Sequence, residues 1–599
     1  MSPTTPTVTH LLQRNAEAWP DRPALSWREP GSADWTTLTW SRVRDRVAGL
    51  AEGYTALGVA PGDHVLLMMG NRPEHWLSDL ALVRAGAVTT TVYSTSAPDQ
   101  VHYIARHSRA RLAVVGDAAT ARVWERPAAD PDTPLERVVV VDGADPECGH
   151  VPFADLAAGS ATGPVDPESG HVPDPGDRLT VVYTSGTTGE PKGVVLTHRH
   201  VFDNATALDR VVELPDHAAH ICYLPLAHIA ERMLGLYLPL YRASHVWLCA
   251  DPQDLPEVLR HVRPPQFFGV PRVWEKLASA LRAGLDRLPE EQRAAVDRAR
   301  ALAAEHLARR ERGEPVPDEL DESFHQARDQ VLRPLLAAAG LDRVVWAASA
   351  SAPMPLEVVR FWAGLGVAVM DAWGLTESTG VATVNSPVSG FRLGSVGRPL
   401  DGVELRVADD GEVLLRGATV FEGYLRPDGT VEPAADAEGW FATGDVGRRD
   451  EDGFVWITDR KKELIVTSHG KNVAPSPVEN ALKEHPLIGQ AYVHGDGRPH
   501  LVALLVLDPE TAPVWAAAHG ADTGGDGRSL AEHPAVLAEV DRAVGAANAR
   551  LSRPEQVKRH RLLDREWGPA TGELTPSLKL RRRVVQDLYR EELAALYAP

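Results

Sequence analysis

The residues with the clearest capacity for chemistry form one loop, YTSGTTGEPKG, which runs from Tyr183 to Gly193. Gly186 and Gly189 allow the backbone to turn its N–H groups toward one point. Hydroxyl groups and one ammonium group add further donors; they belong to Thr184, Ser185, Thr187, Thr188 and Lys192. Because donors that converge in this way match the many oxygens of a polyphosphate, the loop is predicted to bind one.

Two β-like runs border this phosphate loop, at residues 179–183 and 194–197, so a strand, a loop and a strand are predicted in that order. The loop is not a Walker A loop, because that pattern requires glycine at the position of Pro191. An ordinary polar turn is the alternative interpretation. The unbroken run of hydroxyl and glycine residues from Thr184 to Gly189 favours phosphate binding.

The phosphate loop resembles the Ser/Thr/Gly-Pro-Lys-Gly loop of the acyl-adenylate-forming superfamily, which includes acyl-CoA synthetases, adenylation domains of peptide synthetases and luciferases. Five further motifs match in the expected order, and the resemblance extends from about residue 10 to the end of the chain. It implies an enzyme that uses ATP and Mg²⁺ to convert a carboxylate into an acyl-adenylate, and that then passes the acyl group to CoA.

The heptapeptide DAWGLTE, residues 371–377, resembles a family motif whose threonine contacts a nucleotide phosphate and whose glutamate holds Mg²⁺. The resemblance assigns these roles to Thr376 and Glu377. One carboxylate is enough, because Mg²⁺ is often held by one carboxylate together with substrate phosphates and water; taken alone, a Thr-Glu pair more often caps a helix. Trp373 stands where tyrosine is usual, so its indole can stack on adenine while any contact of the tyrosine hydroxyl is lost.

Asp445, in the segment FATGD, resembles the aspartate that accepts hydrogen bonds from both ribose hydroxyls, a role that suits an ionised carboxylate. A turn aspartate is the alternative. Arg460 matches an arginine that reaches the ribose or a phosphate. Small residues at 348–353 resemble the segment along adenine and the acyl-chain entrance, with a tight turn as the alternative. The other residues assigned to the nucleotide site are Ala350, Ser351, Ala352, Asp371, Gly374 and Ile457.

The C-terminal part is predicted to supply a catalytic cation and a hinge. The segment ELTPSLKLRRR, residues 573–583, resembles the family's C-terminal lysine motif, which designates Lys579 as a catalytic residue. Lys462 matches the position about which the small C-terminal domain rotates, with an exposed linker residue as the alternative. The loop at 468–472 resembles the segment that lines the pantetheine tunnel for CoA. The residues assigned to this tunnel are Ser468, Gly470 and Lys471.

Three segments favour the long-chain branch: residues 223–232, residues 573–583 and a charged helical stretch near 285–335. The predicted function is a long-chain fatty acid–CoA ligase that forms acyl-AMP with release of pyrophosphate, and then acyl-CoA with release of AMP. A fatty acyl-AMP ligase that loads a carrier protein, a medium-chain or aromatic acid–CoA ligase and an inactive binding protein are the alternatives. A peptide-synthetase domain is disfavoured, because neither its pocket aspartate nor a carrier domain is evident. The residues assigned to the acyl pocket are His228, Phe268, Gly269 and Val270.

The elements that must position these residues alternate between helices and short apolar strands. Helical spacing at 41–57 is followed by a strand-like run at 64–69, a helix opened by Pro73 and a β-rich run at 88–93. Such alternation is typical of α/β layers with mostly parallel sheets. The predicted fold is α/β, with a large N-terminal domain of layered α/β sheets plus a β-rich subdomain, and with a small mobile α+β C-terminal domain.

Changes of pattern along the chain predict the domain limits. Residues 1–458 are predicted to form an N-terminal AMP-binding domain, with a helical insertion at about 285–335 and the β-rich subdomain at about 402–457. Residues 459–599 restart with their own helix and strand patterns, and they are predicted to form the mobile domain that carries Lys579.

Net charge and cysteine content argue against some classes of partner and site, and the hydropathy pattern bears on the location of the protein. The formal net charge is −20, so the molecule as a whole repels nucleic acids and anionic surfaces. The three cysteines form no CxxC or Cys/His cluster, which argues against a disulfide framework and a structural zinc site. Neither a secretory leader nor a run of about 18 apolar residues is evident. A cytoplasmic location is predicted, with a peripheral contact at the inner membrane face as an option for substrate uptake.

Overall fold

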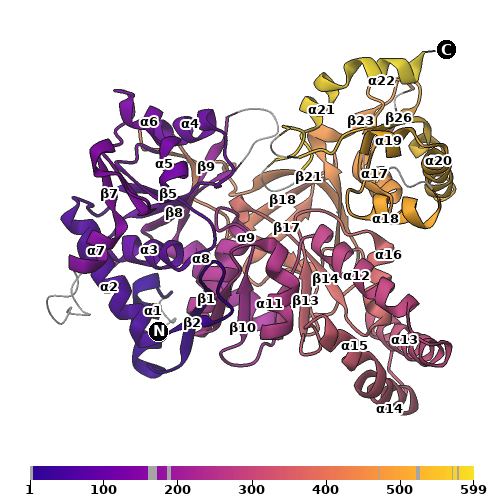
Figure 1. Cartoon of the computed structure of the whole chain (residues 1–599), viewed down its shortest axis with the longest axis horizontal. Coiled ribbons are helices and arrows are strands. Elements are labelled where there is room, and N and C mark those ends of the chain that lie inside the picture. Colours follow the sequence, from indigo (N-terminus) through magenta and orange to yellow (C-terminus); the bar gives the residue numbers. More distant parts are fainter. Residues whose placement is uncertain are drawn as a thin grey trace.

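The structure of the chain is a computed structural model that describes residues 5–159, 171–184, 190–469, 471–520, 527–568, 571–575 and 579–598. Figure 1 shows a large body built from the N-terminal and central parts of the chain, with the C-terminal part above it at the upper right. Strands of the body and strands of the C-terminal part belong to different sheets. The predicted fold class, a layered α/β body with a smaller α+β part, is confirmed.

The largest sheet of the described residues has nine strands in the order β20-β19-β9-β8-β4-β3-β5-β6-β7. The run from β8 through β4 and β3 to β7 is parallel. The strands are β3 (His64–Met68), β4 (Val88–Thr91), β5 (Leu112–Asp117), β6 (Arg137–Asp142), β7 (His150–Pro152), β8 (Arg178–Thr184), β9 (Lys192–Thr197), β19 (Gly423–Leu425) and β20 (Val431–Glu432).

The central strands of this sheet are buried on both faces, because their side chains alternate between two cores. Val65 and Leu67 of β3 join the core that contains α1 to α3, whereas Leu66 and Met68 join the core that contains α4 and α5. A near-continuous apolar run is what a parallel strand covered on both faces requires. The helices are α1 (Val8–Ala18), α2 (Trp40–Ala56), α3 (Pro73–Arg84), α4 (Pro98–Ser108), α5 (Ala118–Arg122), α6 (Glu125–Ala129) and α7 (Phe153–Gly159).

Two smaller sheets of the described residues extend the body, in the orders β12-β13-β14-β15-β16 and β10-β11-β1-β2. In the first, β12 to β14 run parallel and β14 then pairs with β15 as an antiparallel hairpin. The strands are β12 (Gln266–Phe268), β13 (Trp346–Ser349), β14 (Val369–Leu375), β15 (Gly380–Val384), β16 (Arg398–Pro399), β10 (Ala219–Cys222), β11 (His245–Leu248), β1 (Pro23–Arg28) and β2 (Trp35–Thr39). Their neighbouring helices are α8 (His198–Val211), α9 (Ile229–Arg232), α10 (Leu238–Arg242), α11 (Leu255–Val262) and α16 (Leu356–Gly364).

A helical segment projects at the lower right of Figure 1. It consists of α12 (Pro271–Asp286), α13 (Glu290–Glu311), α14 (Asp318–Ala327) and α15 (Arg333–Ala338). Helix α13 buries Val296, Ala299, Ala303 and Leu307, apolar residues that recur at helical spacing. The segment begins before residue 285, the predicted start of the insertion, because α12 starts at Pro271. Proline suits the first position of a helix, since its missing N–H removes no helical hydrogen bond there.

The β-rich part forms a four-stranded antiparallel sheet in the order β17-β18-β21-β22, counted over the described residues. Its strands are β17 (Val403–Val407), β18 (Glu412–Gly417), β21 (Phe441–Arg449) and β22 (Val455–Arg460). The short strands β19 and β20 lie within the predicted limits of the β-rich subdomain, yet β19 pairs with β9 of the large sheet. Strand β22 also continues past residue 458 and ends at Arg460, where the linker to the C-terminal part begins.

The C-terminal part has its own three-stranded sheet, β25-β26-β27, counted over the described residues, with one core on each face. Leu501, Ala503 and Leu505 of β26 face one core, and Val502, Leu504 and Val506 face the other. The elements are β23 (Ile465–Val466), β24 (Asn472–Val473), α17 (Pro475–Lys483), β25 (Ile488–His494), β26 (Leu501–Leu507), α18 (Thr511–Ala518), α19 (Gly527–Glu532), α20 (Pro534–Asn548), β27 (Val557–Leu563), α21 (Arg582–Leu588) and α22 (Arg590–Tyr597). Over the described part of the chain, no helix combines the length and apolar character needed to cross a membrane.

Candidate active site

Asp445 of β21 is buried and joins a polar cluster that connects the five-stranded sheet to the β-rich sheet. It pairs in register with Arg460 of β22, and Nε of Arg460 lies 2.7 Å from its Oδ1. The indole Nε1 of Trp373, on β14, donates to its Oδ2 at 2.8 Å. Burial raises the pKa of Asp445, while the Arg460 charge and the Trp373 hydrogen bond oppose that rise. The structure therefore brings three of the predicted nucleotide-site residues together.

Glu377 lies in a short turn after β14, next to Thr376, and both residues are half-buried. The hydroxyl of Tyr424 donates to Oε1 of Glu377 at 2.8 Å. Nζ of Lys192, at the end of the phosphate loop, lies 4.7 Å from the centroid of the same tyrosine ring. Burial and the Glu377 charge raise the pKa of Tyr424, so its hydroxyl keeps its proton. Tyr424 thus links Lys192 to Glu377.

Sequence reasoning missed Tyr424, because its place depends on the long-range pairing of β19 with β9. Tyr424 stands opposite Val194, two residues beyond Lys192. No spacing within the short segment around Tyr424 signals that pairing.

The two strands around the phosphate loop are found as predicted, with Thr184 opposite Lys192 in an antiparallel pair. The remaining predicted loop residues lie outside the described residues, and their role stays a prediction. They are Ser185, Gly186, Thr187, Thr188 and Gly189.

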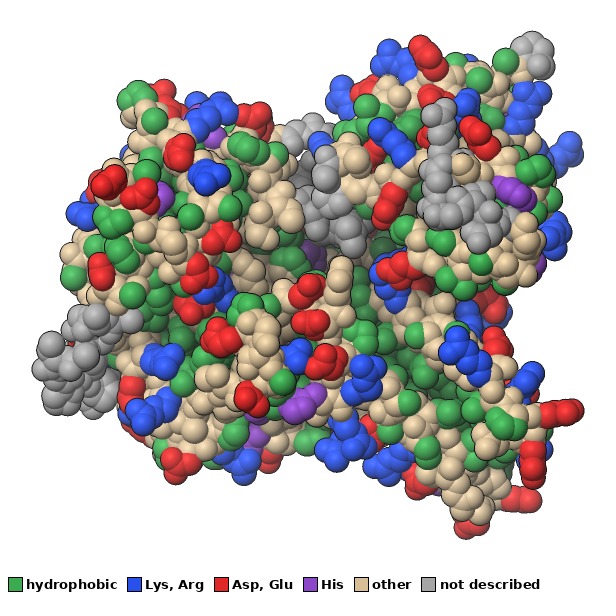
Figure 2. Space-filling view, viewed as in Figure 1, with side chains coloured by type: hydrophobic (Ala, Val, Ile, Leu, Met, Phe, Trp, Pro, Cys, Tyr) green, Lys and Arg blue, Asp and Glu red, His purple; other side chains and the backbone are tan. Residues whose placement is uncertain are grey.

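Lys579 comes from the C-terminal part, and its charge interacts with Asp445, Glu377 and Glu463. Solvent reaches its side chain, yet surrounding protein and the nearby Arg460 charge lower the pKa of its ammonium group, and the three carboxylates oppose this. In the space-filling view a hollow separates the C-terminal part from the left side of the body (Figure 2). The charge of the predicted catalytic lysine therefore acts on the predicted ribose and metal carboxylates of the other part of the chain.

His228 is half-buried and precedes α9 directly, and its Nδ1 accepts a hydrogen bond from the Ala230 N–H at 3.2 Å. Burial and the charge of Lys579 lower the pKa of His228 to about 3, so its ring is neutral at physiological pH. A neutral ring is compatible with the predicted place beside an acyl group.

The small-residue segment follows β13. Ser351 has φ 77°, a left-handed conformation, and is exposed between Ala350 and Ala352. Asp371 lies on the neighbouring strand β14. Its Oδ1 is buried and has no hydrogen-bond partner among the described residues. Burial raises its pKa to about 8. Ser349 at the end of β13 pairs in register with Asp371, which lies two positions before Trp373 on β14.

Three of the residues proposed for the acyl pocket lie around the end of β12, in close packing. The Phe268 carbonyl accepts a hydrogen bond from the Tyr223 hydroxyl at 3.0 Å. A Cβ added at Gly269 would lie 2.9 Å from Nε1 of Trp274, so the indole fills the space next to Gly269. Val270 stands at the N-cap position of α12. Their predicted role as pocket walls stays a prediction.

Ile457 and two of the residues predicted for the CoA tunnel have other partners among the described residues. Ile457 faces Gly447 within the β21–β22 hairpin. In the turn between β23 and β24, the Ser468 N–H donates to the Arg498 carbonyl at 2.9 Å, and the Lys471 N–H donates to Oγ1 of Thr467 at 3.2 Å. Gly470 lies outside the described residues.

Lys462 lies between two residues that are held by opposite parts of the chain. Nζ of Lys461 lies 2.6 Å from Asp410 and 2.7 Å from Glu412 of the β-rich sheet. Glu463 pairs with Arg582 of α21 at 3.1 Å. Lys462 itself forms no ion pair with any described residue. The residue before Lys462 is therefore anchored to the β-rich part, and the residue after it is anchored to α21 of the C-terminal part.

Two ion pairs join the helical segment to the C-terminal part. Arg272 of α12 pairs with Asp508, which is buried just before α18. Lys276, one turn further along α12, pairs with Glu510 at 2.5 Å. No sequence motif signals these contacts.

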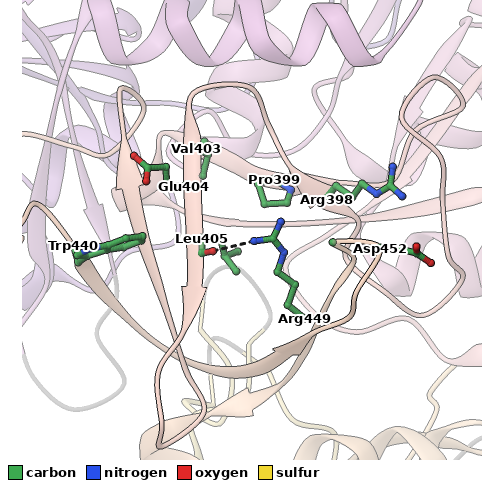
Figure 3. Close-up of a pocket in the computed structure, with 9 residues that line it drawn as sticks. Arg398, Pro399, Val403, Glu404, Leu405, Trp440, Arg449 and Asp452 are labelled. Carbon is green, nitrogen blue, oxygen red and sulfur yellow. Dashed lines mark hydrogen bonds between the residues drawn. The ribbon is translucent and has the colours of Figure 1, made fainter.

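One cavity of the described residues lies on another part of the body. A cavity of about 570 Å³ lies on the β-rich sheet, where Arg449 donates to the Leu405 carbonyl at 3.3 Å (Figure 3). None of the residues that line it belongs to the predicted site. They are Arg398, Pro399, Val403, Glu404, Leu405, Trp440, Arg449, Asp452 and Gly453.

The fold and the polar cluster define an AMP-binding enzyme. Residues 12–425 match the family described as AMP-binding enzyme, and residues 462–599 match the AMP-binding enzyme C-terminal domain. The chain belongs to this family.

Named relatives cover nearly the whole chain. The long-chain-fatty-acid–CoA ligase FadD15 of Mycobacterium bovis is 34% identical over 94% of this chain and 92% of its own length. The long-chain-fatty-acid–CoA ligase ACSBG2 of Gallus gallus is 29% identical over 99% of this chain and 81% of its own length.

Solved structures share the fold. The adenylation domain of a carboxylate reductase from Mycobacterium chelonae has a TM-score of 0.76 at 22% identity, over 99% of this chain and 91% of that one. The anthranilate CoA ligase AuaEII in complex with anthranoyl-AMP has a TM-score of 0.72 at 20% identity, over 99% of both chains.

Proposed function

We propose that this chain is a long-chain fatty acid–CoA ligase, an acid–thiol ligase that uses ATP and releases AMP. The observation that carries the proposal is the electrostatic interaction of Lys579 with Asp445 and Glu377 across the two parts of the chain, beside the ion pair of Arg460 with Asp445. The relatives named long-chain-fatty-acid–CoA ligases support the choice of substrate. An inactive binding protein would have no need of a cation at that position.

In the first half-reaction a fatty carboxylate oxygen attacks the α-phosphorus of ATP. The bond from that phosphorus to the pyrophosphate oxygen breaks, and pyrophosphate leaves with its electron pair. The Lys579 ammonium group offsets the negative charge that develops on the phosphoryl oxygens. Thr184 and Lys192 are proposed to hold the departing phosphates, and Asp445 the ribose. Acyl-AMP remains on the enzyme.

The residues present fit a Mg²⁺ ion that arrives with the nucleotide. The described residues contain no group of three or more His, Cys, Asp and Glu side chains that could hold a metal by themselves. Glu377 provides one carboxylate, whose Oε1 is oriented by Tyr424. Because Mg²⁺ is commonly held by one or two carboxylates plus substrate phosphates, Glu377 would hold the ion together with Thr376 and ATP. When bound, Mg²⁺ neutralises charge on the phosphate oxygens.

In the second half-reaction the C-terminal part is proposed to turn about Lys462 and to withdraw Lys579. The sulfur of CoA then attacks the acyl carbon, the bond from that carbon to the AMP oxygen breaks, and the thiol proton passes to water. Ser468, Gly470 and Lys471 are proposed to line the route of the pantetheine arm. No protein nucleophile is needed, because the mixed anhydride is already activated.

The test is AMP release from fatty acids of graded length, measured with and without CoA. We expect CoA-dependent AMP release that rises with chain length and is highest at roughly twelve to eighteen carbons. Each buried methylene contributes about 0.8 kcal/mol, so extension from eight to twelve carbons gains at most about 3 kcal/mol, a roughly two-hundredfold ceiling. Highest efficiency with acetate or benzoate would contradict the long-chain assignment. Acyl transfer to a carrier protein but not to CoA would identify an acyl-AMP ligase.

A further inference from the structure

The two oxygens of the Asp445 carboxylate contact different side chains. Arg460 forms an ion pair with Oδ1, and the indole N–H of Trp373 donates a hydrogen bond to Oδ2. We propose that Trp373 is a positioning residue for nucleoside recognition: it orients Oδ2 of Asp445, so that the enzyme selects a ribonucleotide over a deoxyribonucleotide. This inference rests on the proposed function, in which Asp445 binds the ribose of ATP.

The number of acceptor sites on Asp445 matches this role. An ionised carboxylate offers about four acceptor sites on its two oxygens. The Trp373 N–H occupies one site on Oδ2, and Arg460 lies 2.7 Å from Oδ1 in an ion pair, so at least one site is left on each oxygen. Two remaining sites suit the two hydroxyls of a ribose diol. Among the described residues, Trp373 is the side chain that donates a hydrogen bond to Oδ2. If its indole N–H is removed, no other described side chain fixes the direction of Oδ2.

The surroundings make the Trp373 contact effective. Trp373 and Asp445 are 9% and 4% exposed, so water competes little for the hydrogen bond between them. An indole N–H donates but cannot accept, and therefore it favours the ionised carboxylate. Burial raises the pKa of Asp445, and the two donors oppose that rise. They help to keep the carboxylate in the form that accepts hydrogen bonds from hydroxyls.

The backbone of β14 holds the indole in place. Trp373 pairs with Thr383 of β15. At the next position a Cβ on Gly374 would lie 1.7 Å from the Gly380 carbonyl oxygen, so the strands touch closely there. The Trp373 ring also packs in the main core of the body. A ring confined in this way presents its N–H to Asp445 in one direction.

The experiment compares three substrates in pyrophosphate exchange with a fatty acid: ATP, 2′-deoxy-ATP and 3′-deoxy-ATP. Trp373→Phe keeps an aromatic ring but removes the donor. Replacement of Trp373 by 3-benzothienylalanine keeps the shape of the indole and removes only the N–H. Trp76→Phe is the matched control, because its buried indole donates to the Gly235 carbonyl at 3.0 Å, apart from the site.

We expect both Trp373 replacements to raise the KM for ATP by about ten- to a hundredfold, the range for a hydrogen bond to a charged group. The penalty for one of the two deoxynucleotides should fall by a similar factor. The penalty for the other should persist, because Arg460 still holds Oδ1. Trp76→Phe should lower stability to heat and leave both penalties unchanged.

An equal rise in KM for all three nucleotides would overturn the inference, since it would assign Trp373 to packing or to stacking on the base. Unchanged penalties in both Trp373 replacements would overturn it as well. Failure of the proposed function is distinguishable, because the unaltered protein would then catalyse no pyrophosphate exchange with ATP and any fatty acid.

Discussion

Removal of the ion pair between Arg272 and Asp508 should weaken adenylate formation more than thioester formation. Arg272 lies in α12 of the body, whereas Asp508 precedes α18 of the C-terminal part. In the proposed reaction cycle this pair exists only while Lys579 faces Asp445, and it breaks when the C-terminal part turns. Arg272→Met therefore destabilises the adenylate-forming arrangement without a matching effect on the thioester-forming arrangement.

The exposure of the two side chains sets the magnitude. Asp508 is 2% exposed and Arg272 is 36% exposed, so the pair lies between a surface pair and a buried one. Loss of one partner costs about 3 to 5 kcal/mol in a buried pair, and an exposed pair contributes roughly 0.2 to 1 kcal/mol. An intermediate value of about 2 kcal/mol corresponds to a roughly thirtyfold shift in population.

The neighbouring pair provides a matched control. Lys276 and Glu510 also bridge α12 and the C-terminal part, but their side chains are 49% and 64% exposed. Lys276→Met should therefore shift the population by less than about fivefold. Asp508→Asn tests the same pair from the other side, because asparagine can still accept the backbone N–H groups of Glu510 and Thr511.

Pyrophosphate exchange measures the first half-reaction, and transfer from a supplied acyl-adenylate to CoA measures the second. Arg272→Met and Asp508→Asn are expected to slow exchange by up to about thirtyfold, with transfer to CoA maintained. Equal losses in both half-reactions would refute this reasoning. An effect of Lys276→Met as large as that of Arg272→Met would refute the dependence on burial.

Three further predictions concern the lysines of the proposed cycle. Lys579→Ala should slow adenylate formation roughly a hundred- to a thousandfold, or about 3 to 4 kcal/mol, and leave thioester formation from supplied acyl-adenylate largely intact; equal damage to both would contradict its assignment. Burial and Arg460 lower the pKa of Lys579, so the protonated, active form is lost as pH rises, at a pH below the ordinary lysine value of 10.5. Exchange rates across alkaline pH should show this decline, and Lys579→Arg, whose guanidinium stays protonated, should lack it. Lys462→Pro fixes φ at the linker and should impair the CoA step far more than exchange; an unaffected CoA step would place the pivot elsewhere.

The sequence by itself determined the local features of this protein. The strands on either side of the phosphate loop and the buried face of α13 follow from short-range periodicity, which each segment carries within itself. The family and its two parts follow from motifs of a few residues in a fixed order.

Tertiary structure alone decided the partners of the site residues. Trp373 and Asp445 are 72 positions apart, and Tyr424 and Glu377 are 47 apart. Such pairs depend on the register between strands and on which sheets pack together, and neither is encoded by spacing within one segment. The pairing of β19 with β9 instead of with the β-rich sheet is one example. The charge interactions of Lys579 and the ion pair of Arg272 required still more, because they arise only where the body and the C-terminal part lie against each other.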